Sequence, residues 1–287
     1  LRGPLIAAAR DRIRSAALLA TGGMRALPPD QRELHIRSLR AALAGAFAET
    51  SEPVAVRAGV LSGREEARLA WRSVAERYGS KRHAILETGG ASVQLACGTG
   101  GNSNISAHSW PLGMNAAIAQ MQAAVASSTI TDDDFAQCFP FGTNDALTDF
   151  AGCRALIHRV LLKSPVFSAD AGAKNCAQFA QANSTDAPLY ALGSSWKAIF
   201  RGMQTLSLNT VELRRFGAEV CANRKITAVE RTSPYLQRRC WLYAYQSVWL
   251  DLSGYHEVRR GSDSWPRGAA VDGNYVPACE TPGPGSP

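Results

Sequence analysis

Hydrophobic side chains in the first hundred residues switch between a spacing of two and a helical spacing. Alternation or short apolar runs predict strands at 16–20, 54–60, 83–87 and 91–97. Between these strands lie segments whose apolar residues recur every three or four positions, which predicts helices. One helix opens at Pro28-Pro29 and reaches Phe47, and another is predicted over 64–78. Strands that are mixed with helices in this way predict an α/β fold.

The rest of the chain has a mostly helical pattern. Apolar residues keep a helical period over 114–127, 150–163, 190–206, 209–222 and 235–252. A short helix is also predicted over 4–14, whereas the Pro- and Gly-rich segment from Trp265 onward is expected to be disordered. At 287 residues the chain is long enough for two domains, each with its own core.

The charge of the chain suggests an anionic ligand, and nucleotides and phosphates fit this charge as well as a nucleic acid does. The 31 basic and 24 acidic residues give a net charge of +7, but the basic residues are scattered. A nucleic-acid-binding arm would show a longer basic run, so we expect nucleotides or phosphates as ligands and no nucleic-acid partner. No apolar stretch reaches 18 residues, so we expect a membrane anchor only outside this chain. The chain opens at Leu1 in the middle of a pattern, which predicts that its true N-terminus is missing.

Seven cysteines point to an oxidising compartment. There is no CxxC pair and the five histidines are dispersed, so a zinc site is not expected. Five of the cysteines fall between 138 and 240, at spacings that suit disulfides, although buried free thiols are the alternative. The sequons at Asn104 and Asn183 are compatible with secretion. We therefore expect a secreted, cell-surface or secretory-pathway protein.

Two turns with paired glycines follow predicted strands, in ATGGMR (20–25) and ETGGASVQ (87–94). Glycines let backbone N–H groups approach an anion closely, and successive amides form a nest for phosphate. Strand alternation also places Ser92 and Gln94 on one face, where they add a hydroxyl and an amide. Ordinary hairpin turns are the alternative interpretation.

Two adjacent carboxylates, Glu65 and Glu66, open the helix predicted over 64–78. Carboxylates in a first helical turn complement the helix dipole, which explains the pair structurally. The other interpretation is that one of them faces a cleft and acts on a substrate.

Three motifs in order, ATGGMR, LSGREEARLAW and ILETGGASVQLA, resemble those of the nucleoside triphosphate diphosphohydrolase (apyrase) family. Further similar stretches extend the resemblance over nearly the whole chain. It implies an actin-like fold of two ribonuclease-H-like lobes with the site in the cleft between them. Lobe one, which is incomplete, would comprise 1–60 and 262–287, and lobe two 61–261. The family's first motif, an Asp-Ala-Gly-Ser phosphate loop, has no counterpart here, so we expect an N-terminally truncated chain that hydrolyses nucleotides poorly by itself.

The resemblance also implies roles for individual residues. Glu66 corresponds to the catalytic base, and Ser92 and Gln94 correspond to residues that hold the attacking water. Glu87 stands where the family has an aspartate that holds a divalent metal, Mg or Ca, through water. The implied phosphate contacts are Thr21, Gly22, Gly89, Gly90 and Ala91, and the implied aromatic pair around the nucleotide base is Trp196 and Tyr245. The family pattern also pairs Cys138 with Cys153 and Cys221 with Cys240, which leaves an odd number of cysteines.

The resemblance predicts a hydrolase of phosphoanhydride bonds. Its substrate would be a nucleoside tri- or diphosphate of the ATP, ADP, GDP and UDP class, attacked at the terminal phosphate by a water that Glu66 activates. SGREEARL looks as much like the base motif of an exopolyphosphatase or guanosine pentaphosphatase of the same superfamily, which is the first alternative. A non-catalytic nucleotide-binding protein is the second, because the first phosphate loop is missing and glutamate replaces aspartate at position 87.

Overall fold

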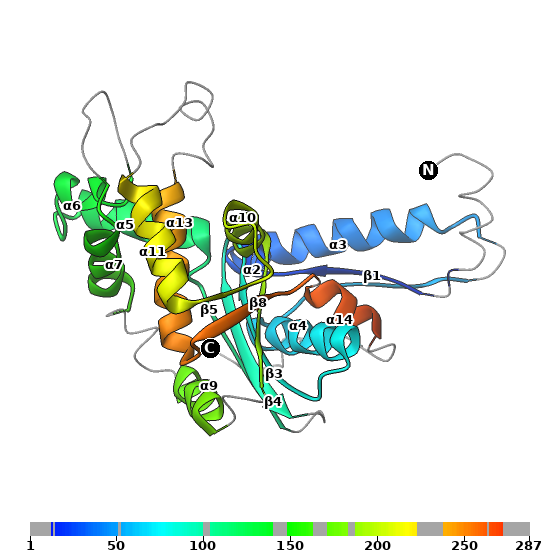
Figure 1. The fold of residues 1–287 in the computed structure, drawn as a ribbon. Coiled ribbons are helices and arrows are strands. Elements are labelled where there is room, and N and C mark those ends of the chain that lie inside the picture. The colour runs from blue at the N-terminus through cyan, green and yellow to red at the C-terminus, as the bar shows by residue number, and fades with distance from the viewer. Residues whose placement is uncertain are drawn as a thin grey trace. The chain divides into compact units, whose positions relative to one another are not determined.

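The computed structural model describes residue 13 and residues 15–50, 53–99, 104–139, 148–162, 171–182, 187–222, 238–262 and 264–271 (Figure 1). The chain divides between Ser62 and Gly63 into two compact units. The predicted helix over 4–14 lies outside the described residues. No helix of the described ranges is long and apolar enough to cross a membrane.

The N-terminal unit contains a parallel strand pair joined by a helix. Strands β1 (Ser15–Ala20) and β2 (Ala55–Val60) pair in parallel, and α2 (Gly22–Arg25) and α3 (Pro29–Ala46) lie between them in the chain. Guanidinium groups tie the helices to the end of β2: Arg25 donates to the Leu61 carbonyl at 2.8 Å and Arg40 to the Ala58 carbonyl at 3.1 Å. The strands and the long helix predicted here are confirmed.

The second unit is built on one mixed sheet. Within the described residues its strand order is β5-β4-β3-β6-β8-β7. Strands β3 to β5 form an antiparallel meander, β6 and β8 continue the sheet in parallel with β3, and β7 pairs antiparallel with β8. A meander followed by parallel strands confirms the expected ribonuclease-H-like arrangement. The bounds are β3 Arg82–Thr88, β4 Val93–Thr99, β5 Ile105–Trp110, β6 Leu189–Leu192, β7 Ser207–Asn209 and β8 Glu257–Arg260.

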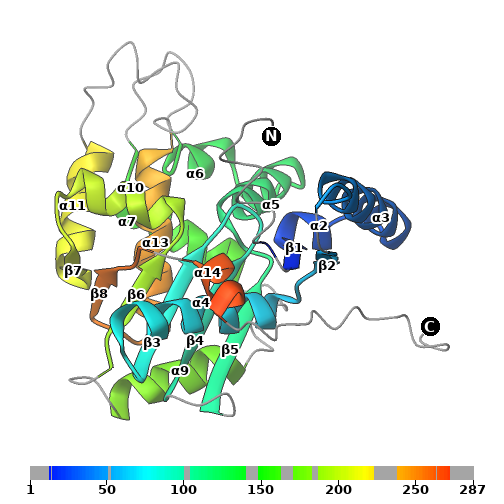
Figure 2. The ribbon, with the colours of Figure 1, turned by 90° about the vertical axis from the view of Figure 1, so that its right-hand side faces the viewer.

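Helices cover both faces of this sheet (Figure 2). One face packs on α4 (Gly63–Tyr78), with Ile85 and Ala96 among the buried side chains, and α14 (Trp265–Val271) packs on α4. The other face, with Leu86 and Leu95, packs into the larger core, which the remaining helices build. These are α5 (Met114–Ala126), α6 (Asp132–Ala136), α7 (Phe150–Ile157), the π-helical η2 (His158–Leu162), α9 (Ala171–Ala182), α10 (Ser194–Gly202), α11 (Thr210–Ala222) and α13 (Arg239–Ser253).

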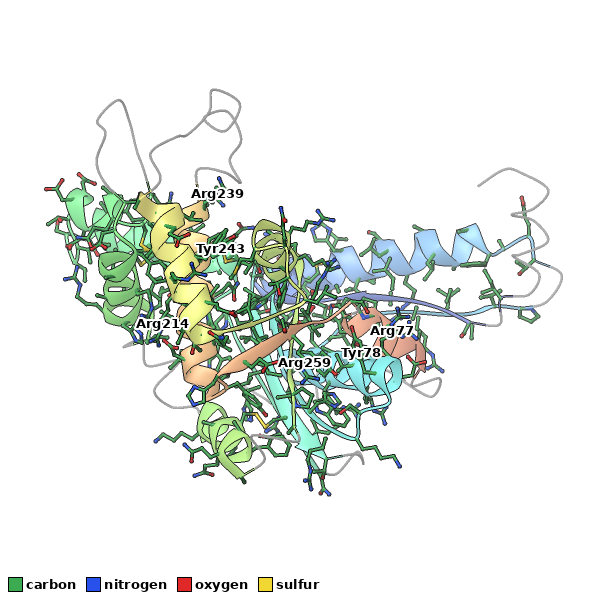
Figure 3. All side chains as sticks on the ribbon, in the orientation of Figure 1. Arg77, Tyr78, Arg214, Arg239, Tyr243 and Arg259 are labelled. Carbon is green, nitrogen blue, oxygen red and sulfur yellow. A yellow bond between two sulfur atoms is a disulfide. The ribbon has the colours of Figure 1, made fainter. Side chains whose placement is uncertain are left out.

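The last turn of α4 is fastened to the sheet by aromatic stacking. Tyr78 stacks on Tyr190 of β6 with ring centroids 4.6 Å apart. Arg259 of β8 adjoins Tyr190 and its charge favours the phenolate, although burial raises the pKa of that tyrosine more strongly. Tyr78 and Arg259 are labelled in Figure 3. This packing fixes the direction of α4, whose opposite end carries Glu66.

Disulfides join distant segments of the second unit. Cys138–Cys153 and Cys221–Cys240 are bonded, which confirms both predicted pairs. Cys97 of β4 is bonded to Cys176 of α9 across 79 positions of sequence, a pair that the sequence analysis did not identify. Cys279 lies outside the described residues.

Three predictions about secondary structure and boundaries need correction. The segment 190–206 is not one helix: β6 ends at Leu192, Gly193 turns the chain with a φ of +96°, and α10 follows. Glycine is required there because a Cβ would lie 2.5 Å from the Thr88 carbonyl oxygen. The segment from Trp265, expected to be disordered, begins with α14, and the contacts place α14 in the second unit instead of with residues 1–60. The short strands β5, β7 and β8 were not predicted.

Candidate active site

The two carboxylates at the start of α4 differ in exposure. Both lie in the first helical turn, but Glu66 is buried whereas Glu65 is half-exposed. Glu66 shares a buried face with Ala70 and Ser73, four and seven positions further on, because successive helical residues point about 100° apart. The interpretation of the pair as helix capping therefore accounts for Glu65 better than for Glu66.

Polar side chains line up across three strands on the face of the sheet that α4 covers. Glu87, near the end of β3, pairs in register with Gln94 of β4, which pairs with Ser109 of β5. The amide of Gln94 donates to the Ser92 hydroxyl at 2.7 Å and to the Ser109 hydroxyl at 3.3 Å. Glu87, Ser92 and Gln94 are all buried. Cross-strand register has thus gathered a carboxylate, an amide and two hydroxyls.

Burial and a neighbouring carboxylate perturb the ionisation of Glu87. Burial, and to a smaller extent the negative charge of Glu66, raise the pKa of Glu87 from 4.5 to about 7, so the two carboxylates repel each other. The Ser264 hydroxyl and the charge of Lys197, at the start of α10, act in the opposite direction. Glu87 Oε2 is buried and makes no hydrogen bond within the described part of the chain. The site thus holds a carboxylate oxygen that has no hydrogen-bond partner among the described residues.

The glycine turn between β3 and β4 rests on the start of α5. Gly89 N donates to the Ser92 carbonyl at 3.0 Å, while the amides of Met114 and Asn115 donate to the carbonyls of Gly89 and Gly90 at 2.9 and 2.8 Å. These bonds hold the turn in one shape. Gly90 is exposed and Ala91 is half-exposed, so a ligand can reach the turn.

A buried polar network that the sequence analysis missed supports the end of β3 from the opposite face. The Thr88 hydroxyl donates to Gln246 Oε1 at 3.1 Å, Gln246 Nε2 donates to the Ser195 hydroxyl at 3.2 Å, and that hydroxyl donates to the Thr88 carbonyl at 3.2 Å. The network joins β3, α13 and α10. No local signal identifies it, because Ser195 and Gln246 are isolated polar residues within helical segments.

Thr21 and Gly22 belong to the N-terminal unit. The Thr21 carbonyl accepts the amides of Met24 and Arg25, and Gly22 is the first residue of α2. TGGMR is therefore mostly a single helical turn that follows β1, and not an open loop. The role of both residues in phosphate binding stays a prediction.

The aromatic pair expected around a nucleotide base is placed in the core. The side chains of Trp196 and Tyr245 are 0% and 1% exposed. The Tyr245 ring stacks on Trp241, and its hydroxyl donates to the Leu112 carbonyl. As they lie in the structure, neither ring presents a face to a ligand, which corrects that expectation.

The residues present suit a divalent cation that is held largely through water better than one enclosed by protein ligands. Among the described residues, no three His, Cys, Asp or Glu side chains are grouped so as to hold a metal. Ca²⁺ takes about six to eight oxygen ligands, whereas Mg²⁺ keeps several waters and needs one or two carboxylates together with substrate phosphates. The unpartnered Oε2 of Glu87 and the nearby charge of Glu66 match the second arrangement.

Comparisons with known proteins identify the fold. No family model matches the chain, and no curated protein does. An exopolyphosphatase from Cytophaga hutchinsonii is similar over 89% of this chain and 74% of its own, at 14% identity and a TM-score of 0.50. A PPX-GPPA enzyme from Aquifex aeolicus is similar over 88% of this chain and 73% of its own, at 12% identity and a TM-score of 0.50. An exopolyphosphatase-like protein is similar over 88% of this chain and 76% of its own, at 14% identity and a TM-score of 0.54. The chain has the actin-like, ribonuclease-H-like α/β fold that its sequence predicted.

Proposed function

We propose that this protein hydrolyses the terminal phosphoanhydride bond of a phosphate chain, with polyphosphate or a guanosine pentaphosphate as its substrate. The observation that carries the proposal is the buried carboxylate pair, Glu66 and Glu87, on the sheet face where Gln94 holds Ser92. A buried carboxylate whose pKa is raised, with a second carboxylate beside it, is typical of sites that move protons or hold metal ions. The exposed glycine turn at Gly90 directly follows β3, the strand that carries Glu87.

Each residue has a role in attack by water on the terminal phosphorus. Ser92 and Gln94 hold the water, and Glu66 accepts its proton as the new P–O bond forms. The bridging P–O bond breaks, so that the shortened phosphate chain leaves and the attacked phosphoryl group becomes orthophosphate. The amides of Gly90 and Ala91 bind the phosphoryl oxygens, whereas the amide of Gly89 donates to the Ser92 carbonyl and shapes the turn. A magnesium ion, held through water by Glu87, would neutralise charge on the phosphates.

The substrate class is inferred from what the site lacks for a nucleotide. Trp196 and Tyr245 are buried in the core, so the expected base-binding pair is not available, which favours a substrate that is recognised through its phosphates. The exopolyphosphatases among the similar structures and the SGREEARL motif support the same choice. A nucleoside tri- or diphosphatase is the second candidate, which the Cys138–Cys153 and Cys221–Cys240 pairs favour because they follow the apyrase pattern.

Substrate comparison separates the candidates. The full-length protein with Mg²⁺ should release phosphate from polyphosphate or guanosine pentaphosphate faster than from ATP, ADP, GDP or UDP. The reverse order would favour the second candidate. Nucleotide binding without any phosphate release would support a non-catalytic protein and overturn the proposal.

The role of Glu66 is tested against its neighbour. Glu66→Gln keeps the size of the side chain but removes its basicity, so kcat should fall by roughly 10²–10⁴-fold. KM should change little, because the side chain acts on the water and not on the bound substrate. Glu65→Gln changes the same helical turn and the same formal charge, and it should keep nearly all activity. Equal effects of the two substitutions would contradict the assignment.

We also propose a secretory or cell-surface location, which the disulfides support because such bonds persist in oxidising compartments. Peptide mapping of the natively located protein under non-reducing conditions should recover Cys221 linked to Cys240. Free thiols at both positions would contradict this location.

A further inference from the structure

Helix α14 is docked tightly on α4, the helix that carries Glu66 (Figure 1). Arg267 donates to Glu76 of α4 at 2.6 Å, and Trp265 packs against the apolar cluster beneath α4. The backbones approach so closely that a Cβ on Gly268 would lie 1.8 Å from the Leu69 carbonyl oxygen. Ser264 directly precedes α14, so the docking of this helix also fixes the position of Ser264.

Ser264 is held against the carboxylate of the candidate metal residue. Its hydroxyl donates to Glu87 Oε1 at 2.5 Å, across 177 positions of sequence. The second carboxylate oxygen, Oε2, is buried and has no partner within the described residues. One oxygen of Glu87 is thus anchored by Ser264, and the other has no hydrogen-bond partner in the described part of the chain and is available to a ligand.

A glutamate at this position needs such an anchor. Compared with the aspartate of the resembling family, Glu87 has one more methylene and one more rotatable bond, so its carboxylate has more orientations to lose on binding a cation. A hydrogen bond to one oxygen removes most of that freedom in advance, which is the general effect of preorganisation.

We propose that Ser264 is a positioning residue whose hydroxyl orients the Glu87 carboxylate so that Oε2 is presented to a hydrated divalent cation. This inference rests on the function proposed above. It assigns the C-terminal helix α14 a part in the site, although the residues that do the chemistry lie on α4, β3 and β4.

Three substitutions separate orientation of Glu87 from capping of α14. Ser264 directly precedes the first residue of α14, the position from which a side chain can cap a helix, and there glycine costs only a few tenths of a kcal/mol and alanine about 1 kcal/mol. Ser264→Thr keeps both the cap and the hydroxyl, Ser264→Gly keeps most of the cap without the hydroxyl, and Ser264→Ala loses both. Ser262→Ala removes a hydroxyl two positions earlier, where the side chain is bonded to Tyr78, and serves as the matched control.

The main readout is Mn²⁺ binding to the full-length protein, measured by electron paramagnetic resonance of free Mn²⁺, with circular dichroism to verify folding. Ser264→Ala and Ser264→Gly should both weaken Mn²⁺ binding by about 3- to 10-fold, the effect of one lost hydrogen bond. Ser264→Thr should restore binding to within about twofold, and Ser262→Ala should match the wild type. In hydrolysis assays, the Mg²⁺ concentration for half-maximal rate should rise by the same factor while substrate KM stays unchanged.

Two results would overturn the inference. If Ser264→Gly binds Mn²⁺ like the wild type and only Ser264→Ala is impaired, capping explains the effect. If Ser264→Ala and Ser264→Gly both match the wild type while Glu87→Gln abolishes Mn²⁺ binding, Ser264 does not position Glu87 and the proposed function is untouched. Failure of the proposed function gives a different result: the wild type releases no phosphate, and Glu87→Gln leaves Mn²⁺ binding unchanged. That result overturns both the proposed function and the inference about Ser264.

Discussion

The buried carboxylate of Glu87 should make the metal-free protein less stable as the pH rises. Burial and the charge of Glu66 raise the pKa of Glu87 from 4.5 to about 7. Between these values the folded state holds a proton that the unfolded state releases, so the free energy of unfolding falls with increasing pH. At about 1.36 kcal/mol per pH unit the full loss is about 3 kcal/mol, complete once the pH is above about 7.

Replacing Glu87 with glutamine removes this ionisation while keeping the shape of the side chain. We expect urea unfolding of the wild type, without divalent cations and with disulfides intact, to lose about 2–3 kcal/mol more than Glu87→Gln between pH 5 and pH 8. The comparison cancels every other titrating group, because both proteins share them. Mg²⁺ should recover part of the loss at pH 8 in the wild type and none in the variant.

Equal pH dependence of the two proteins would refute the reasoning. It would mean that Glu87 ionises at its ordinary pKa, and hence that water reaches the carboxylate or that Glu66 is not close to it. A wild type that gains stability from pH 5 to pH 8 relative to the variant would refute it more strongly, because the sign would be reversed.

Other changes test the surroundings of the site. Burial lowers the pKa of His83 from 6.5 to about 4, so the free energy of unfolding should fall by about 3 kcal/mol as the pH drops through this range. His83→Gln should remove this loss in acid unfolding curves. Replacing Cys97 and Cys176 together by serine opens a 79-residue loop and should lower the free energy of unfolding by about 4 kcal/mol in the chain-entropy model, whereas no change would contradict the bond. Gly268→Ala should cost about 1–3 kcal/mol in urea unfolding, because its Cβ would collide with the Leu69 carbonyl; a neutral effect would contradict the docking of α14.

The sequence by itself determined the elements whose pattern is long enough to have a period. Helices α3 and α4 and the strands β1 to β4 follow from helical or alternating spacing, and the different exposure of Glu65 and Glu66 follows from the helical phase. Strand alternation likewise placed Ser92 and Gln94 on one face, where the structure finds them hydrogen-bonded. These features depend on residues close in the chain, so local stereochemistry suffices for them.

Only the tertiary structure decided which distant residues meet. Strands of three or four residues, such as β7 and β8, are too short for a period to show, and they acquire their form by pairing within the sheet. Two bonds join segments that are far apart in sequence: the Cys97–Cys176 disulfide and the hydrogen bond from Ser264 to Glu87. The burial of Trp196 likewise depends on side chains from distant segments that pack around it. No spacing along the chain encodes such contacts, because they depend on how helices pack on the two faces of the sheet and on which buried polar groups must find partners.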